Sequence, residues 1–164
     1  MKDYFFVFLD IDGVLTDIDC GIHPRTGLRE FKPESVEVLN YLIKKLEEQY
    51  IVRVVITSSL IAEMGKLMRM FRIYNVECDH RIWGVPDGET RGEQIKKFLR
   101  PEPKETGYVI IDDDYHDFLG KFDAKRLIKT SRYEGGLSMQ LVEDFLASLP
   151  KIEVSAAGTG TNPN

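Results

Sequence analysis

Short apolar runs alternate with amphipathic stretches along the whole chain. The run at 5–9 has no polar residue and is typical of a strand buried on both faces, as in a parallel sheet. By the same pattern we expect strands at 5–9, 51–56, 107–111 and 126–130, and an extended segment at 76–85. Apolar positions at helical spacing predict helices at 33–49, 60–71, 91–99, 115–122 and 138–149. This alternation predicts an α/β fold, a three-layer Rossmann-like parallel sheet with helices on both faces.

The length of 164 residues suits one domain, which we expect at 1–150, followed by a flexible tail at 151–164 that is largely small and polar. The segment 14–32 reads as a loop or short hairpin flap, with no room for a separate cap domain. We also expect a chain break at Pro86-Asp87-Gly88 and a core position for Trp83.

Composition narrows the class of protein. Hydrophobic residues make up 43% of the chain and charged residues 30%, and the apolar runs are too short to span a bilayer. The net charge of -5 argues against a surface that grips nucleic acid throughout. Cys20 and Cys78 lie far apart without zinc-ligand spacing, so we expect reduced thiols. With no signal-peptide pattern at the start, we expect a cytoplasmic protein that does not bind membranes.

Polar side chains follow three of the expected strands. Right-handed crossovers would bring these strand ends to one edge of the sheet. Carboxylates clustered there at ~4 Å would repel by ~4 kcal/mol at an effective dielectric constant of about 20, so they need a cation or must partly protonate. Oxygen ligands without His or Cys favour Mg²⁺. The residues at the strand ends are Asp10 and Asp12, Thr57 and Ser58, and Asp112, Asp113 and Asp114.

With a metal bound, one carboxylate can act as a nucleophile and a second as an acid and base, while a cation and a hydroxyl hold a phosphoryl group. Arg91 is the first candidate for the cation and Lys96 the second. Other roles remain open: Thr57 and Ser58 suit helix capping, and Arg91 suits an ion pair with Glu89 or Glu93. We expect Asp114 and Asp117 to be loop or cap residues.

Residues 10–17, Asp-Ile-Asp-Gly-Val-Leu-Thr-Asp, resemble the first motif of the haloacid dehalogenase (HAD) superfamily of phosphatases. Thr57 and the Asp112-Asp113 pair resemble its second and fourth motifs, and the resemblance extends from residue 4 to about 149. It implies that Asp10 forms an aspartyl-phosphate and that Asp12 protonates the leaving oxygen and then activates water. It also implies that Asp10, the Asp12 backbone carbonyl and Asp113, with Asp112, hold Mg²⁺, and that Thr57 and Arg91 grip the phosphate.

A narrower resemblance rests on Ser58-Ser59 and on the segments 91–95, 110–114 and 136–138. These are similar to HAD domains of RNA-repair proteins and to the phosphatase half of phage polynucleotide kinase-phosphatases. The function expected is a Mg²⁺-dependent phosphomonoester hydrolase acting on a phosphorylated substrate such as an oligonucleotide end or a nucleotide. Two alternatives stay open: a phosphorylatable receiver-like signalling module and a catalytically silent HAD-fold binding protein.

Overall fold

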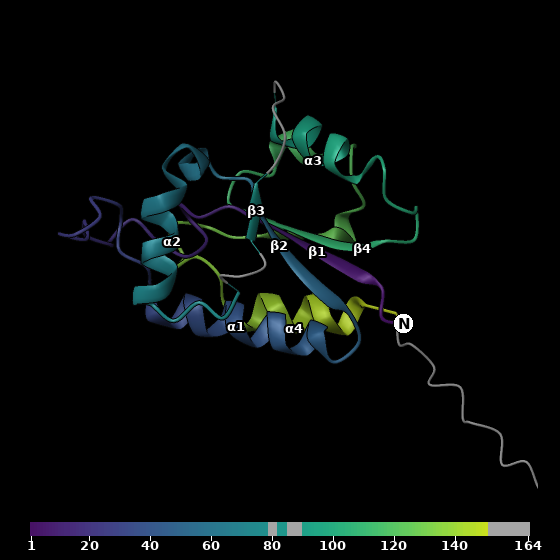
Figure 1. Cartoon of the computed structure of the whole chain (residues 1–164), viewed down its shortest axis with the longest axis horizontal. Coiled ribbons are helices and arrows are strands. Elements are labelled where there is room, and N and C mark those ends of the chain that lie inside the picture. Colours follow the sequence, from purple (N-terminus) through teal and green to yellow (C-terminus); the bar gives the residue numbers. More distant parts are fainter. Residues whose placement is uncertain (79–81, 85–89, 151–164) are drawn as a thin grey trace, which may run out of the picture.

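A computed structural model describes residues 1–78, 82–84 and 90–150 of the chain, apart from the side chain of Ile82. Its centre is a parallel five-stranded sheet in the order β3-β2-β1-β4-β5 (Figure 1). Because all five strands run the same way, their carboxyl ends share one edge. The strands are β1 (Tyr4–Leu9), β2 (Ile51–Ile56), β3 (Ile82–Gly84), β4 (Gly107–Asp112) and β5 (Leu127–Lys129).

Helices cover both faces of this sheet. Residues of α1, α2 and α4 share one large core cluster, whereas α3 packs in a smaller cluster on the opposite face (Figure 1). The predicted three-layer α/β class is therefore confirmed. The helices are α1 (Pro33–Glu47), α2 (Met64–Ile73), α3 (Arg91–Leu99) and α4 (Met139–Ser148), with 3₁₀ turns η1 (Ser59–Glu63), η3 (His116–Phe118) and η4 (Ala124–Arg126).

The central strand β1 explains the uninterrupted apolar run near the start of the chain. Phe5, Val7 and Leu9 belong to the large core cluster, and Phe6 and Phe8 belong to the cluster on the α3 side. Successive side chains of a strand point to opposite faces, so a strand covered on both faces must be apolar at every position. This packing fixes where β1 ends, and with it the position of the polar residues that follow.

Most predicted elements are present, with shifts where local polar contacts compete with the helix. The helix expected at 60–71 begins as η1, because the Ser58 hydroxyl accepts a hydrogen bond from the Leu60 amide and caps a 3₁₀ turn. The helix expected at 115–122 is wrong: only η3 forms, and Gly120 at φ +73° ends any continuation.

The extended segment expected at 76–85 is also much shorter in the described residues, where β3 has only three residues and 77–78 form a turn. The break expected at 86–88 and the tail expected at 151–164 lie outside the described residues. The domain limits stay a prediction.

Trp83 corrects the expectation of a core position, because 47% of its surface is exposed. It lies on β3, at the edge of the sheet, where a strand pairs with it on one side only, and its ring is on the same face as Phe6 and Phe98. Its ring still lies 6.2 Å from that of Phe98 on α3. Cys20 is partly buried and Cys78 is buried, and no disulfide joins them. Among the described helices, none combines the length and apolarity that crossing a bilayer would demand.

Candidate active site

A pocket of about 720 Å³ opens where the carboxyl ends of the strands meet. Asp10 follows β1 directly, and Asp112 and Asp113 stand at the end of β4, the strand paired with β1. Arg91 enters from the first residue of α3. The pocket therefore gathers groups that are as much as a hundred residues apart in the chain, which is what the shared edge of a parallel sheet predicts.

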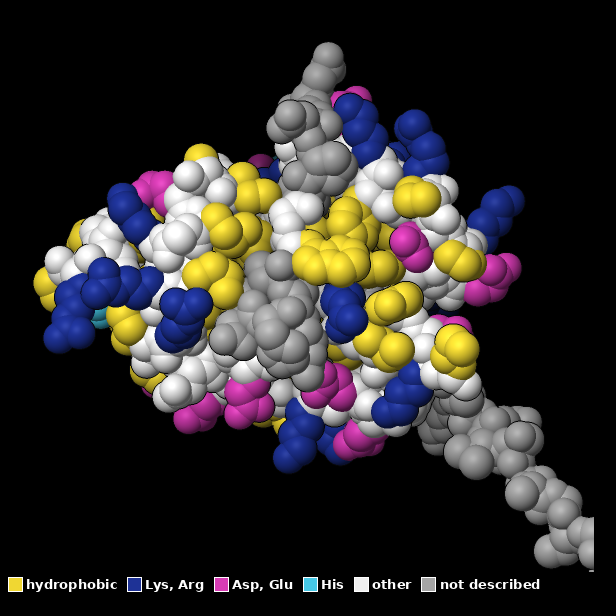
Figure 2. All heavy atoms as spheres, in the orientation of Figure 1, with side chains coloured by type: hydrophobic (Ala, Val, Ile, Leu, Met, Phe, Trp, Pro, Cys, Tyr) yellow, Lys and Arg dark blue, Asp and Glu magenta, His cyan; other side chains and the backbone are white. Residues whose placement is uncertain are grey.

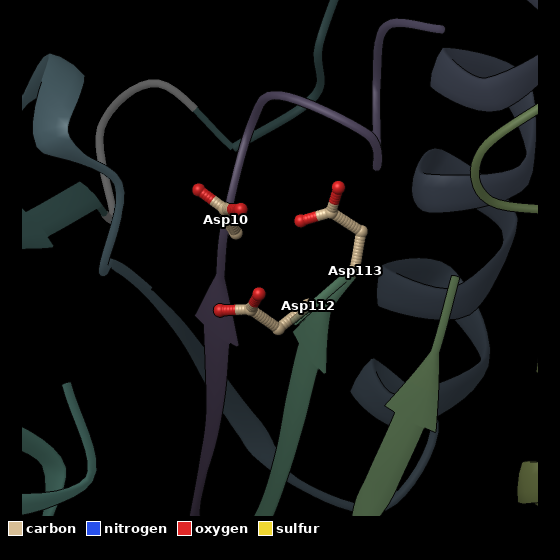
Figure 3. Close-up of side chains that lie close together, drawn as sticks. All are labelled: Asp10, Asp112 and Asp113. Carbon is tan, nitrogen blue, oxygen red and sulfur yellow. The ribbon is translucent and has the colours of Figure 1, made fainter. Parts of the chain in front are cut away.

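Three carboxylates form the centre of the site. One oxygen from each of Asp10, Asp112 and Asp113 lies within 4.8 Å of the others. Figure 3 shows these side chains projecting from the ends of β1 and β4 into a common space. Asp10 and Asp112 are each only 2% exposed. An all-oxygen, mostly buried donor set of this kind fits a hard divalent cation such as Mg²⁺.

Arg91 contacts the same carboxylates. Its Nη1 lies 3.1 Å from Asp10 Oδ2 and 2.8 Å from Asp112 Oδ2. Lys96 lies elsewhere, with its Nζ 5.9 Å from the centre of the Phe122 ring, and it lines a different hollow. Of the two candidate cations, Arg91 is thus the one that the fold brings to the acidic groups.

The first turn of α3 is fixed by two side chains. The Thr90 hydroxyl accepts a hydrogen bond from the Glu93 amide, and the Asp117 carboxylate accepts one from the Gly92 amide at 2.5 Å. Asp117 lies in η3, just beyond the end of β4. The segment that follows β4 and Asp112 therefore also positions the helix that carries Arg91, and Asp117 has the capping role expected of it.

Electrostatics in the site favour a bound cation. Burial, reinforced by the neighbouring Asp112 carboxylate, raises the pKa of Asp10 from 3.8 to about 7, although Arg91 opposes the shift. Burial likewise raises the pKa of Asp112, again against the pull of Arg91. One arginine does not offset the desolvation of both acids, so a further positive charge would stabilise their ionised forms.

Two buried polar atoms have no hydrogen-bond partner within the described chain: Asp10 Oδ1 and Thr57 Oγ1. A buried polar group left unpaired costs about 1–3 kcal/mol, so such groups indicate a ligand that satisfies them. Ser58 differs from its neighbour, because its hydroxyl already caps η1. The capping alternative thus applies to Ser58, while the Thr57 hydroxyl is left for a ligand.

The turn after β1 holds Asp12 beside this centre. The Thr16 hydroxyl donates to Asp12 Oδ1 at 3.4 Å and accepts a hydrogen bond from the Gly13 amide. Gly13 has φ +80°, and a Cβ there would lie 2.2 Å from Asp113 Oδ2. Only glycine permits both the positive φ and the close approach of Asp113, which accounts for the glycine directly after Asp12.

Comparison with known proteins identifies this arrangement. Residues 6–142 match a protein-family model described as the HAD domain in Swiss Army Knife RNA repair proteins. The chain belongs to this family. The match runs from within β1 to within α4 and includes all the acidic residues of the pocket. Among curated proteins, none matches the sequence at a significant level.

Sequence reasoning missed Arg132, which lines the HAD domain's pocket. Its Nη2 and Nε lie 2.6 and 2.8 Å from Asp113 Oδ2. Arg132 comes from the loop after β5, a strand whose end carried no acidic signal, so only its place at the same sheet edge would have identified it. Asp114, by contrast, behaves as a loop residue, since its carboxylate accepts a hydrogen bond from the His116 amide.

The flap of the HAD domain is a short hairpin, as expected for 14–32. Its two arms are joined by an isolated antiparallel bridge between Ile22 and Arg29. The buried Thr26 hydroxyl contacts Met70 Sδ at 3.1 Å and ties the flap to α2. A salt bridge of 2.9 Å between Lys32 and Asp17 closes its base. This segment forms no second domain over the pocket.

Proposed function

We propose that this HAD domain is a Mg²⁺-dependent phosphomonoester hydrolase that acts through an aspartyl-phosphate on Asp10. One observation carries the proposal: Asp10 Oδ1 and Thr57 Oγ1 are buried polar atoms without partners in the described chain, at the edge where Arg91 also points. A phosphoryl group bound there would give the hydroxyl an acceptor and the carboxylate an electrophile. Membership of a HAD family supports phosphatase chemistry at this site.

In the proposed reaction, an Asp10 carboxylate oxygen attacks the phosphorus atom and the bond to the leaving oxygen breaks. Asp12 gives its proton to that oxygen, and the alcohol departs. The Asp12 carboxylate then takes a proton from water, whose oxygen attacks the aspartyl-phosphate and releases inorganic phosphate with Asp10 restored. Arg91 and the Thr57 hydroxyl hold the phosphoryl oxygens throughout, where a positive charge is most effective.

Mg²⁺ would be held by Asp10, Asp112 and Asp113, whose oxygens already converge, together with the Asp12 backbone carbonyl. When bound, the ion would offset the repulsion between these carboxylates and the negatively charged phosphoryl group. Arg91 shares two of these acids, so its guanidinium would move partly from them towards the phosphate. The Arg132 contact with Asp113 orients the most exposed of the three carboxylates.

For the substrate, we propose a phosphorylated oligonucleotide end or a nucleotide. The family to which the chain belongs is described as a domain of RNA repair proteins, and the hairpin flap leaves the pocket open to a large leaving group. The net charge of -5 does not oppose this, because only the rim of the site needs to be basic. Arg29 and Arg132 both line the pocket.

The test is phosphate release from 3'- and 5'-phosphorylated oligonucleotides, nucleotides, sugar phosphates and p-nitrophenyl phosphate, with Mg²⁺ or with EDTA. We expect turnover that requires Mg²⁺ and is lost in Asp10→Asn but kept in Asp144→Asn, a matched change at an exposed position of α4. Undiminished turnover in Asp10→Asn would refute the assigned nucleophile. Absence of turnover on every ester, with Mg²⁺ binding intact, would support the catalytically silent HAD fold instead.

A further inference from the structure

A second hollow, of about 650 Å³, adjoins the acidic pocket on the side of β5. The two hollows share four lining residues: Asp113, Asp114, Arg132 and Tyr133. They are therefore neighbouring parts of one groove, separated only by side chains that face both. The proposed chemistry uses the acidic part and leaves the second part without a role.

The loop after β5 presents an aromatic ring at this junction. Tyr133 is 75% exposed, compared with 44% for Tyr4 on β1. Its loop is nonetheless fixed: the Gly136 amide donates to the Ser131 carbonyl at 2.9 Å, and the Ile18 amide of the flap donates to the Arg132 carbonyl at 3.0 Å. An exposed aromatic on a well-anchored loop is prepared to stack on a ligand, because little order is lost on binding.

This loop also lies on the side of the reaction where the leaving group departs. Arg132 contacts Asp113 and interacts electrostatically with Asp12. In the proposed mechanism Asp12 protonates the leaving oxygen, so the leaving group must lie next to Asp12. The groove that continues past Arg132 and Tyr133 is therefore the direct path for the part of the substrate beyond that oxygen.

The side chains further along the groove suit a heterocycle. Lys129 is exposed, and its Nζ lies 3.8 Å from the centre of the Tyr115 ring. Tyr115 in turn stacks on His116, with 4.7 Å between ring centres. Glu134 adds an acceptor for base N–H groups. Aromatic faces beside cations and hydrogen-bonding groups bind nucleobases, whereas a sugar phosphate offers no flat ring to stack.

We propose that this second hollow binds the nucleoside attached to the scissile phosphate, with its base stacked on Tyr133 and flanked by Lys129. The proposal rests on the proposed phosphatase function and adds the part of the substrate that the enzyme selects. Nucleotide monophosphates and phosphorylated oligonucleotide ends share this nucleoside, and both would be preferred over phosphomonoesters that lack a base.

The experiment compares kcat/KM for glycerol phosphate, a nucleoside monophosphate and an oligonucleotide with the same terminal phosphate. We expect wild-type protein to prefer both nucleotides over glycerol phosphate. Tyr133→Ala should reduce this preference about tenfold, chiefly through KM, since stacking of one base contributes that much or more. Tyr133→Phe should restore it, and Tyr4→Ala, which alters an exposed tyrosine on β1 outside the groove, should leave it unchanged.

The outcomes distinguish failure of the proposed nucleoside subsite from failure of the proposed phosphatase function. An unchanged preference in Tyr133→Ala, or a wild-type protein that hydrolyses glycerol phosphate as well as it does nucleotides, overturns the nucleoside subsite and leaves the phosphatase intact. Hydrolysis of none of the three esters overturns the phosphatase and the subsite together. An effect of Tyr133→Ala on the oligonucleotide alone assigns the hollow to polymer ends, and an equal effect on both nucleotides assigns it to any nucleotide.

Discussion

Replacing Asp10 with asparagine should stabilise the metal-free protein at alkaline pH, because it removes a buried charge while keeping the shape of the side chain. The pKa of Asp10 is raised from 3.8 to about 7, first by burial and then by Asp112. A carboxyl whose folded-state pKa is raised contributes stability that is fully present below about pH 4 and is lost as pH rises to about 7. Asparagine does not titrate, so the variant escapes this loss.

The size of the effect follows from the shift. A rise from 3.8 to about 7 corresponds, at ~1.4 kcal/mol per pH unit, to roughly 4 kcal/mol at pH values above both. The pKa of about 7 already includes the opposing pull of Arg91, so we expect Asp10→Asn to be more stable than wild type by roughly 4 kcal/mol near pH 8 and nearly equal to it near pH 4.

Urea unfolding in EDTA at several pH values measures this difference directly, with Asp144→Asn as the control for removing an exposed carboxylate. Addition of Mg²⁺ should stabilise wild type more than Asp10→Asn, which narrows the difference between the two. A difference between the two proteins that is independent of pH, or a variant that is less stable than wild type near pH 8, would refute the reasoning.

Three further changes probe the frame of the site. Gly13→Ala places a Cβ 2.2 Å from Asp113 Oδ2 on a backbone with φ +80°. We expect calorimetry to show weaker Mg²⁺ binding and urea unfolding to show a free energy of unfolding that is lower by about 1–3 kcal/mol. Unaltered Mg²⁺ affinity would contradict the close approach of Gly13 to Asp113. Asp117→Ala removes the side chain that caps the first turn of α3 and should lower kcat about tenfold by misplacing Arg91. The same change should then have little effect in an Arg91→Ala background. Equal effects in both backgrounds would show that Asp117 does not act through Arg91. Leu39→Ala leaves a cavity at a fully buried position of α1 and should lower the free energy of unfolding by about 2–5 kcal/mol. The protein that remains folded should keep its kcat. A lowered kcat in fully folded protein would show that packing of the core affects the geometry of the active site.

The sheet can be predicted from the sequence because strands buried on both faces, such as β1 and β4, are apolar runs that end where polar residues begin. The same logic brings Asp10, Thr57 and Asp112 to one edge without any coordinates. Apolar residues at helical spacing likewise predict α1, whose observed ends lie within two residues of the expected ones.

What the sequence does not predict depends on contacts between distant segments. The Arg132 contact with Asp113 joins the loops after β5 and β4, and nothing in the local pattern distinguishes Arg132 from any surface arginine. Trp83 is largely exposed because β3 is the edge strand of the sheet, a position that its hydrophobicity does not reveal. The helix expected after Asp114 is reduced to η3, where side-chain contacts with the backbone replace helical hydrogen bonds.

The chemical claim that Asp10 carries the phosphoryl group can be measured on the protein itself. Wild-type protein mixed with Mg²⁺ and a phosphorylated oligonucleotide, quenched rapidly in acid and digested, should yield the peptide containing Asp10 with the mass of one added phosphoryl group. Turnover without that modified peptide, or with the phosphoryl group on any other residue, would contradict the account.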